Sequence, residues 1–458
     1  MAFFSSLSFF LLFSSFLSHA AGWVGVNYGR IADDLPSPDD VVKLLKTHGI
    51  DRIKLFDTES TVLTALSNSN ISVVVSLPNE YLSSAASDPS FTDNWVQSNI
   101  SHFYPSTKID AIAVGNEVFV DPNNTTNFLV PAMKNVYASL QKFNLHTNIK
   151  VSTPLAFSAL ASSYPTSSGS FKPDLIEPVM KPMLDLIRQS QSHLMVNAYP
   201  FFAYIGNADK ISIDYALFRE NAGVIDSGNG LKYSNLLEAQ VDAVFAALSA
   251  IKFEDIPVVV TETGWPSKGD ENEIGASIEN AAAYNGNLVK RVLTGSGTPL
   301  RPKEPLNAYL FALFNENKKQ GPTSERNYGL FYPNEEKVYE IPLTSADVEG
   351  GVGSTPAVNG SKVIKNGQTW CVANGKVAPE KLQAGLDYAC GEGGADCSSI
   401  QPGATCYNPN SLEAHASYAF NSYYQKMKRA VGTCDFGGAA YVVTQPPQYG
   451  QCEFPTEY

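Results

Sequence analysis

VVVTETGWPS, residues Val258–Ser267, joins three β-branched apolar residues to a glutamate and then to a Gly-Trp-Pro sequence. β-branched residues favour strands, and a short apolar run bounded by Gly and Pro is typical of a strand buried on both faces of a parallel sheet. The segment therefore predicts a buried strand that ends at Glu262, with the aromatic ring of Trp265 close by.

A second segment repeats this design, because Ile109–Glu117 (IDAIAVGNE) is another apolar run that ends in Asn and Glu. Short β-rich runs alternate with longer helical stretches, such as Asp39–Thr47 and Leu236–Ala250, from about residue 22 to residue 342. The candidate strands are Trp23–Tyr28, Arg52–Phe56, Ile71–Leu77, Ala111–Val114, Ile149–Ser152, Leu194–Asn197, Pro257–Thr261 and Asn307–Phe311. This alternation predicts an α/β fold, a parallel (β/α)8 TIM barrel.

An open, doubly wound sheet is the alternative fold. Such sheets commonly bind nucleotides through Gly-x-Gly-x-x-Gly after a strand, or through Gly-x-x-x-x-Gly-Lys-[Ser/Thr]. We find neither pattern in this chain, so nothing in it marks a nucleotide site. In a barrel, the chemistry is expected at the carboxyl ends of the strands.

Polar side chains follow six of the eight predicted strands. They are Asn27 and Tyr28, Asp57, Asn116 and Glu117, Asn197 and Tyr199, Glu262, and Glu316 with Lys319. Each position alone is a weak signal, because a strand-end glutamate is more often a solvated loop residue or part of an ion pair. The carboxyl ends of all strands meet at one mouth of a barrel, so the sequence predicts that these residues converge.

Glu117 and Glu262 are the candidate catalytic residues. Hydrolysis of a glycosidic bond uses one protonated carboxylic acid and one carboxylate, about 5–5.5 Å apart in retaining enzymes and about 6.5–9.5 Å apart in inverting ones. Asn116 is placed to hydrogen-bond a sugar 2-hydroxyl, an interaction that strengthens in the transition state. Tyr199 is placed to donate to the nucleophile and hold it ionised.

The candidate substrate-binding residues are Tyr28, Asn116, Asn197, Tyr199, Phe202, Trp265, Glu316 and Lys319. The ring of Trp265 is suited to stacking on a sugar. For Tyr28, Tyr199 and Phe202, core packing is the alternative to lining a sugar subsite. Glu316 has three alternatives: binding sugar, tuning the pKa of the acid, or forming a structural ion pair with Lys319.

Catalysis or metal binding that depends on histidine is not supported by the positions of the histidines. None of the six histidines lies at the carboxyl end of a predicted strand. A Ser/His/Asp triad therefore lacks its base, and a histidine-based metal site lacks its ligands. We expect no metal ion and no organic cofactor.

The net charge of −13 argues against nucleic acid and anionic membranes as partners, and it is compatible with a neutral polysaccharide.

Residues 1–21 begin with an uncharged, Phe- and Leu-rich run that ends in small residues, which predicts a cleaved signal peptide. A membrane anchor is the alternative, but the run is short for a spanning helix. With a polar C-terminus and no lipid-anchor signal, we expect a secreted, extracellular monomer without a membrane anchor. The glycosylation sequons are Asn70, Asn99, Asn123, Asn124 and Asn359.

The cysteines mark a separate C-terminal module. All six lie between Cys371 and Cys452, which in a secreted chain indicates a disulfide-stapled unit. Six cysteines allow 15 pairings, and their spacing does not choose among them. Residues 343–367 are rich in Gly, Ser, Thr and Pro and predict a flexible linker, so the predicted domains are 22–342 and 368–454.

The barrel segment resembles plant glycoside hydrolase family 17, the endo-1,3-β-glucanases. The motifs that carry the resemblance are Gly25–Gly29 (GVNYG), Ala113–Glu117 (AVGNE), Val196–Phe202 (VNAYPFF), Val260–Ser267 (VTETGWPS), Phe314–Asn317 (FNEN) and Gly321–Pro333 (GPTSERNYGLFYP). The resemblance implies a retaining mechanism with Glu117 as acid/base and Glu262 as nucleophile. It also matches Glu316 and Lys319 to further active-site positions.

The C-terminal module resembles carbohydrate-binding module family 43. The matching segments are Trp370–Ala373 (WCVA), Leu386–Cys390 (LDYAC), Gly394–Cys397 (GADC), Ile400–Gly403 (IQPG) and His415–Asn421 (HASYAFN). The resemblance implies the pairs Cys371–Cys434, Cys390–Cys397 and Cys406–Cys452, and binding to 1,3-β-glucan. From its pattern, Leu412–Met427 is the segment of the module that most favours a helix.

The sequence thus predicts a secreted hydrolase of 1,3-β-glucans, such as callose or fungal wall glucan. Two alternatives stay open. One is a glucan-binding wall protein whose barrel is catalytically silent, and the other is a hydrolase of mixed-linkage or 1,6-branched β-glucan.

Overall fold

The computed structural model describes residues 21–295, 297–350 and 369–456, except for short gaps at 375–376, 430–432, 444–446, 448 and 450–451. The predicted signal peptide, the sequon at Asn359 and most of the predicted linker lie outside the described residues. The chain divides into two compact units, residues 1–357 and 358–458.

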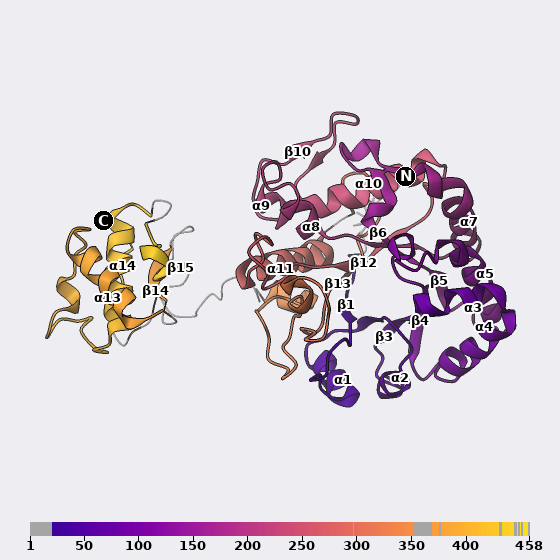
Figure 1. Ribbon diagram of the computed structural model, residues 1–458, viewed down its shortest axis with the longest axis horizontal. Coiled ribbons are helices and arrows are strands. Elements are labelled where there is room, and N and C mark those ends of the chain that lie inside the picture. Colours follow the sequence, from indigo (N-terminus) through magenta and orange to yellow (C-terminus); the bar gives the residue numbers. More distant parts are fainter. Residues whose placement is uncertain are drawn as a thin grey trace, which may run out of the picture. The chain divides into compact units, whose positions relative to one another are not determined.

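The first unit is a barrel of parallel strands (Figure 1). Its strands are β1 Val24–Tyr28, β2 Arg52–Leu55, β3 Ser72–Leu77, β4 Lys108–Val114, β5 Lys150–Ser152, β6 Pro154–Ala156, β9 Leu194–Asn197, β12 Val258–Thr263 and β13 Ala308–Leu310. They pair in the order β5-β4-β3-β2-β1-β13-β12-β9-β6. Only Thr153 separates β5 from β6, so one bent segment meets both of its neighbours and closes the ring. The predicted barrel is confirmed, with its fifth strand split in two.

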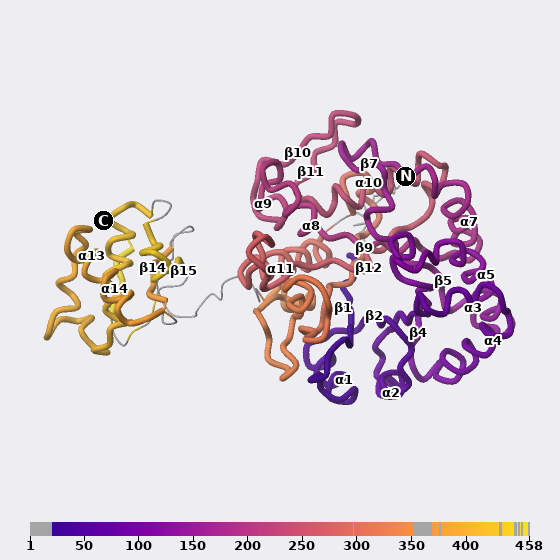
Figure 2. The backbone as a smooth tube through the Cα atoms, in the orientation of Figure 1, coloured from indigo at the N-terminus to yellow at the C-terminus, as the bar shows by residue number. Residues whose placement is uncertain are grey.

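Helices surround these strands (Figures 1 and 2). The main ones are α1 Pro38–Thr47, α2 Ser60–Ala65, α3 Leu82–Ser87, α4 Pro89–Val96, α5 Thr126–Lys142, α7 Lys181–Gln189, α8 Pro200–Ile205, α10 Leu236–Ala250 and α11 Ile278–Thr294. Short helices α6 Pro173–Leu175 and α9 Ile213–Ala216 lie between them, as do the hairpins β7 Leu160–Ser162 with β8 Ser170–Phe171 and β10 Val224–Ile225 with β11 Lys232–Tyr233.

Local sequence sets the helix boundaries. In α1, the side chain of Ser37 accepts a hydrogen bond from the backbone of Asp40, and Pro38 begins the helix. In α10, the side chain of Asn235 accepts from the backbone of Glu238. Such caps satisfy backbone N–H groups that have no partner within the helix. Both predicted helices are therefore present with nearly the predicted bounds.

Two apolar cores hold the barrel together. A large core lies between the sheet and the helices and includes Val258 and Val260. A small one includes Val259, Ala113 and Met195, from β12, β4 and β9, whose side chains meet inside the barrel. Successive strand residues point to opposite faces, so this division tells which strand side chains face the barrel interior.

The start of the predicted linker is helical in the structure. Helix α12 spans Ser345–Glu349 and begins with a capping box between Thr344 and Asp347. Leu343, just before it, packs against the main core. The Thr-x-x-Asp pattern carries this signal, which the Gly- and Ser-rich composition of the following residues hid.

The second unit is a small module with its own core. It contains helices α13 Pro379–Cys390 and α14 Leu412–Lys426, and an antiparallel pair of strands, β14 Trp370–Ala373 and β15 Ala440–Val443. Disulfides join Cys371 to Cys434, Cys390 to Cys397 and Cys406 to Cys452. These are the pairs that the resemblance implied.

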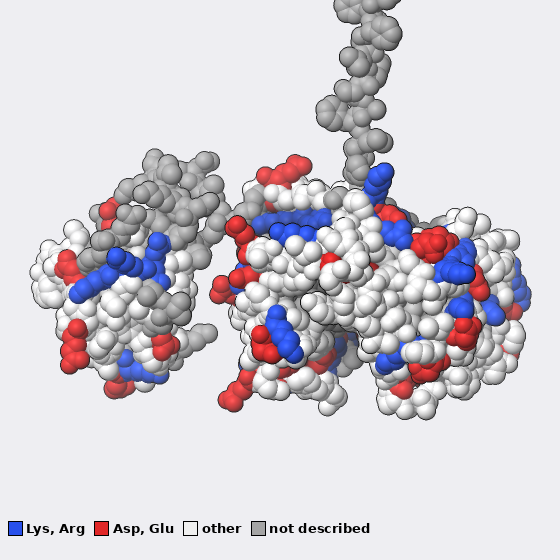
Figure 3. Space-filling view, turned by 90° about the horizontal axis from the view of Figure 1, so that it is seen from above, with Lys and Arg blue, Asp and Glu red and all other residues white. Residues whose placement is uncertain are grey.

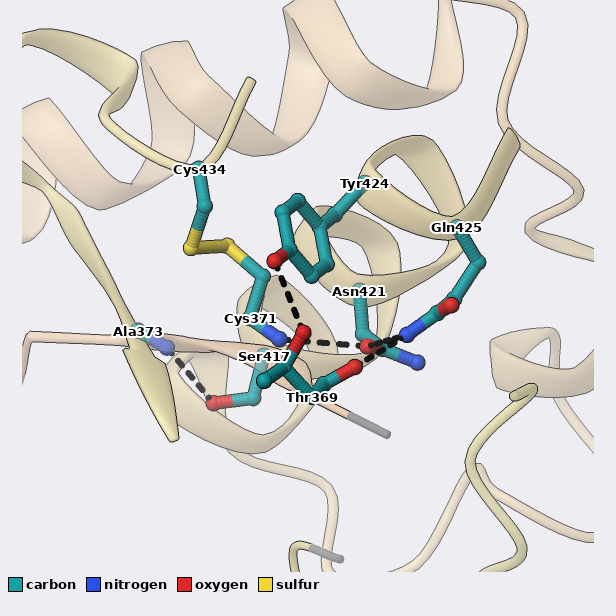
Figure 4. Close-up of a disulfide and its surroundings, with 8 residues drawn as sticks. All are labelled: Thr369, Cys371, Ala373, Ser417, Asn421, Tyr424, Gln425 and Cys434. Carbon is teal, nitrogen blue, oxygen red and sulfur yellow. Dashed lines mark hydrogen bonds between the residues drawn. A yellow bond between two sulfur atoms is a disulfide. The ribbon is translucent and has the colours of Figure 1, made fainter. Parts of the chain in front are cut away.

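Side chains of α14 complete the second edge of β14 (Figure 4). The backbone of Cys371 donates to Asn421 at 3.1 Å, and the backbone of Ala373 donates to Ser417 at 3.0 Å. Next to the strand, Gln425 donates to the carbonyl of Thr369 at 2.6 Å. A two-stranded ribbon is marginal alone, and this docking on a helix beside the Cys371–Cys434 bridge stabilises it.

Candidate functional site

A cavity of about 850 Å³ lies in the barrel unit and contains both candidate carboxylates. Its wall is formed by Gly29, Arg30, Ile31, Phe56, Asp57, Asn116, Glu117, Ala156, Phe157, Ser158, Asn197, Tyr199, Phe202, Ala203, Gln240, Glu262, Phe311, Glu316, Lys319, Glu325 and Tyr328. Most of these residues follow the carboxyl ends of barrel strands. Aromatic walls with a few acidic groups suit a sugar, whose rings have apolar faces and hydroxyl edges.

An irregularity in β12 turns Glu262 into the cavity. Strict alternation would place Glu262 on the outer face with Val258 and Val260. Instead, the register with β9 shifts between Val260 and Glu262. Thr261 faces inward and donates to Asn197 at 2.9 Å, and Glu262 also lines the cavity. A β-bulge, which re-aims a side chain, thus gives two consecutive inward residues.

Each carboxylate oxygen of Glu262 has its own partner. Lys54 Nζ lies 2.8 Å from Oε1, and the hydroxyl of Tyr199 donates to Oε2 at 3.0 Å. Burial, together with the charge of Glu262, raises the pKa of Tyr199 well above its usual value, so this phenol stays a donor. Lys54 is fully buried, and the ion pair supplies the counter-charge that it needs. A cation at one oxygen and a hydroxyl donor at the other both stabilise negative charge on Glu262.

Glu117 follows β4 in a left-handed conformation, with φ 50°. Its backbone N–H donates to the carbonyl of Pro154 at 2.9 Å. Asn79 holds the preceding residue at two points, accepting from the N–H of Asn116 at 2.8 Å and donating to its carbonyl at 2.9 Å. These backbone bonds fix the direction in which Glu117 enters the cavity.

Burial raises the pKa of Glu117, and the negative charge of Glu262 raises it further. A hydrogen bond from Asn197 and the charge of Lys54 act in the opposite direction. Glu117 therefore holds a proton more tightly than a glutamate in water does. Two carboxyl groups in unlike environments are what a general acid and a nucleophile require.

Asn197 connects the two carboxyl groups. Its Oδ1 accepts from the hydroxyl of Thr261 at 2.9 Å, and its Nδ2 donates to Glu117 at 2.9 Å. The carbonyl of Thr261 in turn accepts from Asn27 at 2.9 Å. With Oδ1 facing the hydroxyl of Thr261, the amino group of Asn197 faces Glu117.

Glu316 and Lys319 both line the cavity, but they do not form an ion pair with each other. Lys319 lies 3.4 Å from Glu325, whereas Glu316 accepts from the backbone N–H of Ile31 at 2.8 Å. Burial raises the pKa of Glu316, and the nearby charge of Lys319 lowers it. Of the three alternatives for Glu316, an ion pair with Lys319 is not the contact observed.

Two comparisons with protein families cover both units. The model of the glycosyl hydrolases family 17 matches residues 24–343, and the X8 domain model matches residues 369–441. The chain belongs to glycosyl hydrolase family 17.

Relatives of this family 17 chain match along nearly its whole length. Glucan endo-1,3-beta-glucosidase 13 of Arabidopsis thaliana is 42% identical over 95% of this chain and 85% of its own length. Glucan endo-1,3-beta-D-glucosidase of Olea europaea is 41% identical over 99% of this chain and 98% of its own length. A solved structure, a β-1,3-glucanase and allergen of Cryptomeria japonica pollen, is 44% identical with a TM-score of 0.68, covering 70% of this chain and 99% of its own.

The structure corrects the prediction for Trp265, whose side chain is fully buried and absent from the cavity wall. Its ring packs edge-on against Phe201, and its Nε1 donates to the carbonyl of Gly275 at 2.8 Å. Gly264 and the chain turn after it carry the ring back into the core. A sugar cannot stack on a ring in this position.

Tyr28 also lies outside the cavity wall in this family 17 fold. Alternation in β1 places it with Val26 in the outer core, where its ring lies 6.1 Å from that of Phe314. Burial raises its pKa to about 12. Of the two alternatives for Tyr28, core packing is the observed one, whereas Tyr199 and Phe202 line the cavity.

Several cavity residues were not predicted from the sequence, including Phe157, Gln240, Phe311, Glu325 and Tyr328. They follow strands in loops or lie on α10, so no strand-end pattern marks them. For Lys54, the sequence did indicate an inward-facing side chain. In the strand RIKL, alternation places Arg52 and Lys54 on the face opposite Ile53 and Leu55. A lysine inside a barrel needs an anionic partner.

The other predicted features are placed as follows. Asn70, Asn123 and Asn124 are exposed, whereas Asn99 is half-buried and donates to the carbonyl of Trp95 at 2.9 Å. The described residues contain no group of three side chains suited to a metal ion. Within the same residues, no helix is long and apolar enough to cross a membrane. Both signs of charge are interspersed with uncharged surface on the face of the barrel unit in Figure 3.

The module has a smaller cavity of about 380 Å³. Lys381, Ala384, Gly385, Tyr388, Tyr423, Thr433 and Phe436 line it. On α14, Tyr418 and Tyr424 are buried in the core, whereas Tyr423 lies at this cavity.

Proposed function

We propose that this chain is a secreted endo-hydrolase of 1,3-β-D-glucans that retains the anomeric configuration. The observation that carries the proposal is the unequal carboxyl pair in one cavity: Glu117 with a raised pKa, and Glu262 held between Lys54 and Tyr199. The relatives are named glucan endo-1,3-β-glucosidases, which supports this choice of substrate.

In the first step, Glu117 protonates the oxygen of the glycosidic bond while a carboxylate oxygen of Glu262 attacks the anomeric carbon. The leaving glucan departs, and a glycosyl ester of Glu262 remains. In the second step, water attacks the anomeric carbon, and Glu117, now a base, takes its proton. The ester bond breaks and its electron pair returns to Glu262.

Neighbouring groups have supporting roles in this proposal. Asn116 and Asn197 would donate hydrogen bonds to the hydroxyls of the sugar unit that is bound at Glu262. The rings of Tyr199 and Phe202 would contact the sugar units on either side of it. Glu316 and Lys319, which also line the cavity, contribute further polar contacts. The X8 module would hold the enzyme on insoluble glucan and so raise the local concentration of substrate.

A direct test compares reducing-sugar release from laminarin by the wild type and by Glu262→Gln. The variant keeps the size of the side chain but lacks the nucleophile, so we expect a loss of at least about 10⁴-fold in kcat. Glu279→Gln is the matched control, because Glu279 is an exposed glutamate on α11 and is expected to behave like the wild type. Equal release by wild type and Glu262→Gln would reject the assignment.

The linkage preference needs a separate experiment, because a solved structure with a TM-score of 0.64 belongs to a study of two plant β-glucan endohydrolases with distinct substrate specificities. Initial rates on linear 1,3-β-, mixed-linkage and 1,6-branched glucans would measure it. We expect the highest kcat/KM on the linear 1,3-β-polymer. A higher value on the mixed-linkage polymer would favour the alternative.

A further inference from the structure

Lys54 differs from the other charged groups around the candidate nucleophile. It is fully buried, lies in β2 and does not line the cavity, yet its Nζ is 2.8 Å from Oε1 of Glu262. The ring of Phe56 lies 3.9 Å from the same ammonium. Lys54 therefore contacts Glu262 from the protein side and never meets a sugar in the cavity.

The two oxygens of Glu262 are consequently unequal. Oε2 bonds to Tyr199, which lines the cavity, and Oε1 bonds to Lys54, which does not. An anomeric carbon in the cavity is reached from the Oε2 side. Oε1 then becomes the carbonyl oxygen of the glycosyl ester and keeps its contact with the ammonium.

We propose that Lys54 is a positioning residue that selects Oε2 for attack and accelerates the second step of the reaction, breakdown of the glycosyl ester. The inference depends on the double displacement proposed above. In that second step the bond between the anomeric carbon and Oε2 breaks, and its electron pair returns to Glu262. The oxygen of water bonds to the anomeric carbon, and its proton goes to Glu117, while Lys54 keeps its own protons throughout.

Charge explains why the two steps differ. In the first step Glu262 loses its negative charge, so its attraction to Lys54 weakens as the ester forms. In the second step the charge returns, and a cation at hydrogen-bond distance stabilises it in a site with little water. Lys54 therefore favours departure of the carboxylate over its attack, and its removal slows the second step selectively.

The pH dependence gives an independent readout. The titratable groups around Glu117 are Glu262 on β12, Lys54 on β2, Tyr199 after β9 and Glu325. The charge of Lys54 lowers the pKa of Glu117, so removal of the ammonium should move the basic limb of kcat/KM on laminarin to higher pH.

The experiment uses the full-length enzyme and 2,4-dinitrophenyl β-laminaribioside, whose good leaving group needs little protonation. With Lys54→Met we expect a burst of dinitrophenol, an accumulated glycosyl-enzyme visible by intact-mass spectrometry, and a fall of about 10- to 100-fold in both kcat and KM. On laminarin, whose leaving group needs protonation by Glu117, the basic limb of kcat/KM should move to higher pH. Lys54→Arg keeps the charge and should restore most of the rate and the wild-type pH profile.

Controls separate the possible failures. Absence of dinitrophenol release by the wild type would count against the proposed function itself. An active wild type whose Lys54→Met variant, equal in melting temperature, has an unchanged kcat and an unchanged basic limb would overturn only the role of Lys54. If Lys54→Met does not fold, Lys54→Arg decides: a shifted basic limb on laminarin in this charge-conserving variant would also reject the proposal. Tyr199→Phe, which removes a neutral donor from Oε2, should move the basic limb on laminarin less than Lys54→Met.

Discussion

Glu262 and Glu117 reach one cavity by different local devices. Glu262 faces the cavity because the register of β12 shifts beside β9, and Glu117 because the chain takes a left-handed conformation after Gly115. At Gly115, with φ 67°, an added Cβ would meet Val118 and Asn79 at 2.5 and 2.9 Å, so this turn requires glycine. The Gly-Asn-Glu motif therefore combines the turn and the acid.

Substitution of Asn197 tests how its hydrogen bond affects the pKa of Glu117, because the direction of the change is predicted. Its hydrogen bond favours the ionised form of Glu117, so Asn197→Ala should raise the pKa of that carboxyl further above its usual value. Because the acid must be protonated for the first step, the basic limb of kcat/KM on laminarin should move to higher pH, even though the maximal rate falls. A pH–rate series on both proteins measures it, and a basic limb that stays in place or moves to lower pH would contradict this account of Glu117.

At the scale of elements, β-branched runs and strand–helix alternation are sufficient to predict the barrel. All eight predicted strands are present, because parallel strands buried on both faces are nearly continuous apolar runs. The bulge in β12 and the break at Thr153 were not predictable in this way, since both arise from pairing with neighbouring strands. The position of Trp265 was also predicted wrongly. Its motif indicates a turn after the strand, but the direction of the ring depends on residues distant in the sequence.

Helix α10 contains a buried acid that costs stability. Asp242 is fully buried, its Oδ2 accepts from the backbone of Leu300 at 2.8 Å, and burial raises its pKa to about 6. The folded state therefore binds the proton more tightly than the unfolded state does. Stability is expected to fall by up to about 3 kcal/mol as the pH rises from about 4 to above 6, and then to stay level with respect to this group.

Asp242→Asn tests this expectation, because asparagine keeps an oxygen for Leu300 but carries no charge. The variant should exceed the wild type in free energy of unfolding at pH 7 and approach it near pH 4, as measured by urea denaturation of both proteins at several pH values. Asp185→Asn, at an exposed position on α7, is the matched control and should show little difference. A variant that is less stable at pH 7 would show that the charged form is favourable at this position.

At the scale of the whole molecule, the distribution of cysteines along the chain is enough to distinguish the two units. All six lie in the second unit, where three disulfides and a small core hold two helices and two strands together. A core of this size benefits from such staples, whereas the barrel needs none. The family resemblances, unlike the spacing of the cysteines, implied the three observed pairs.

The cavity as a whole was predicted less completely than the pair of acids within it. Strand-end positions identified Glu117, Glu262, Asn116 and Asn197, because the barrel brings those ends together. The walls formed by loops and by α10 depend on how these segments return to the barrel, which no local pattern encodes. Lys54 was predictable in part. Alternation along β2 indicates that its side chain faces the barrel interior, but only the structure identifies its partner.

The stereochemistry of hydrolysis tests the central claim most directly. A carboxylate that attacks the anomeric carbon and is then displaced by water inverts the configuration twice, whereas a base that activates water inverts it once. Proton NMR of a laminari-oligosaccharide, recorded in the first minutes after enzyme is added, distinguishes the two outcomes. We predict that the β-anomer of the new reducing end appears first and the α-anomer only later, by mutarotation. Initial appearance of the α-anomer would contradict the role of Glu262 as nucleophile.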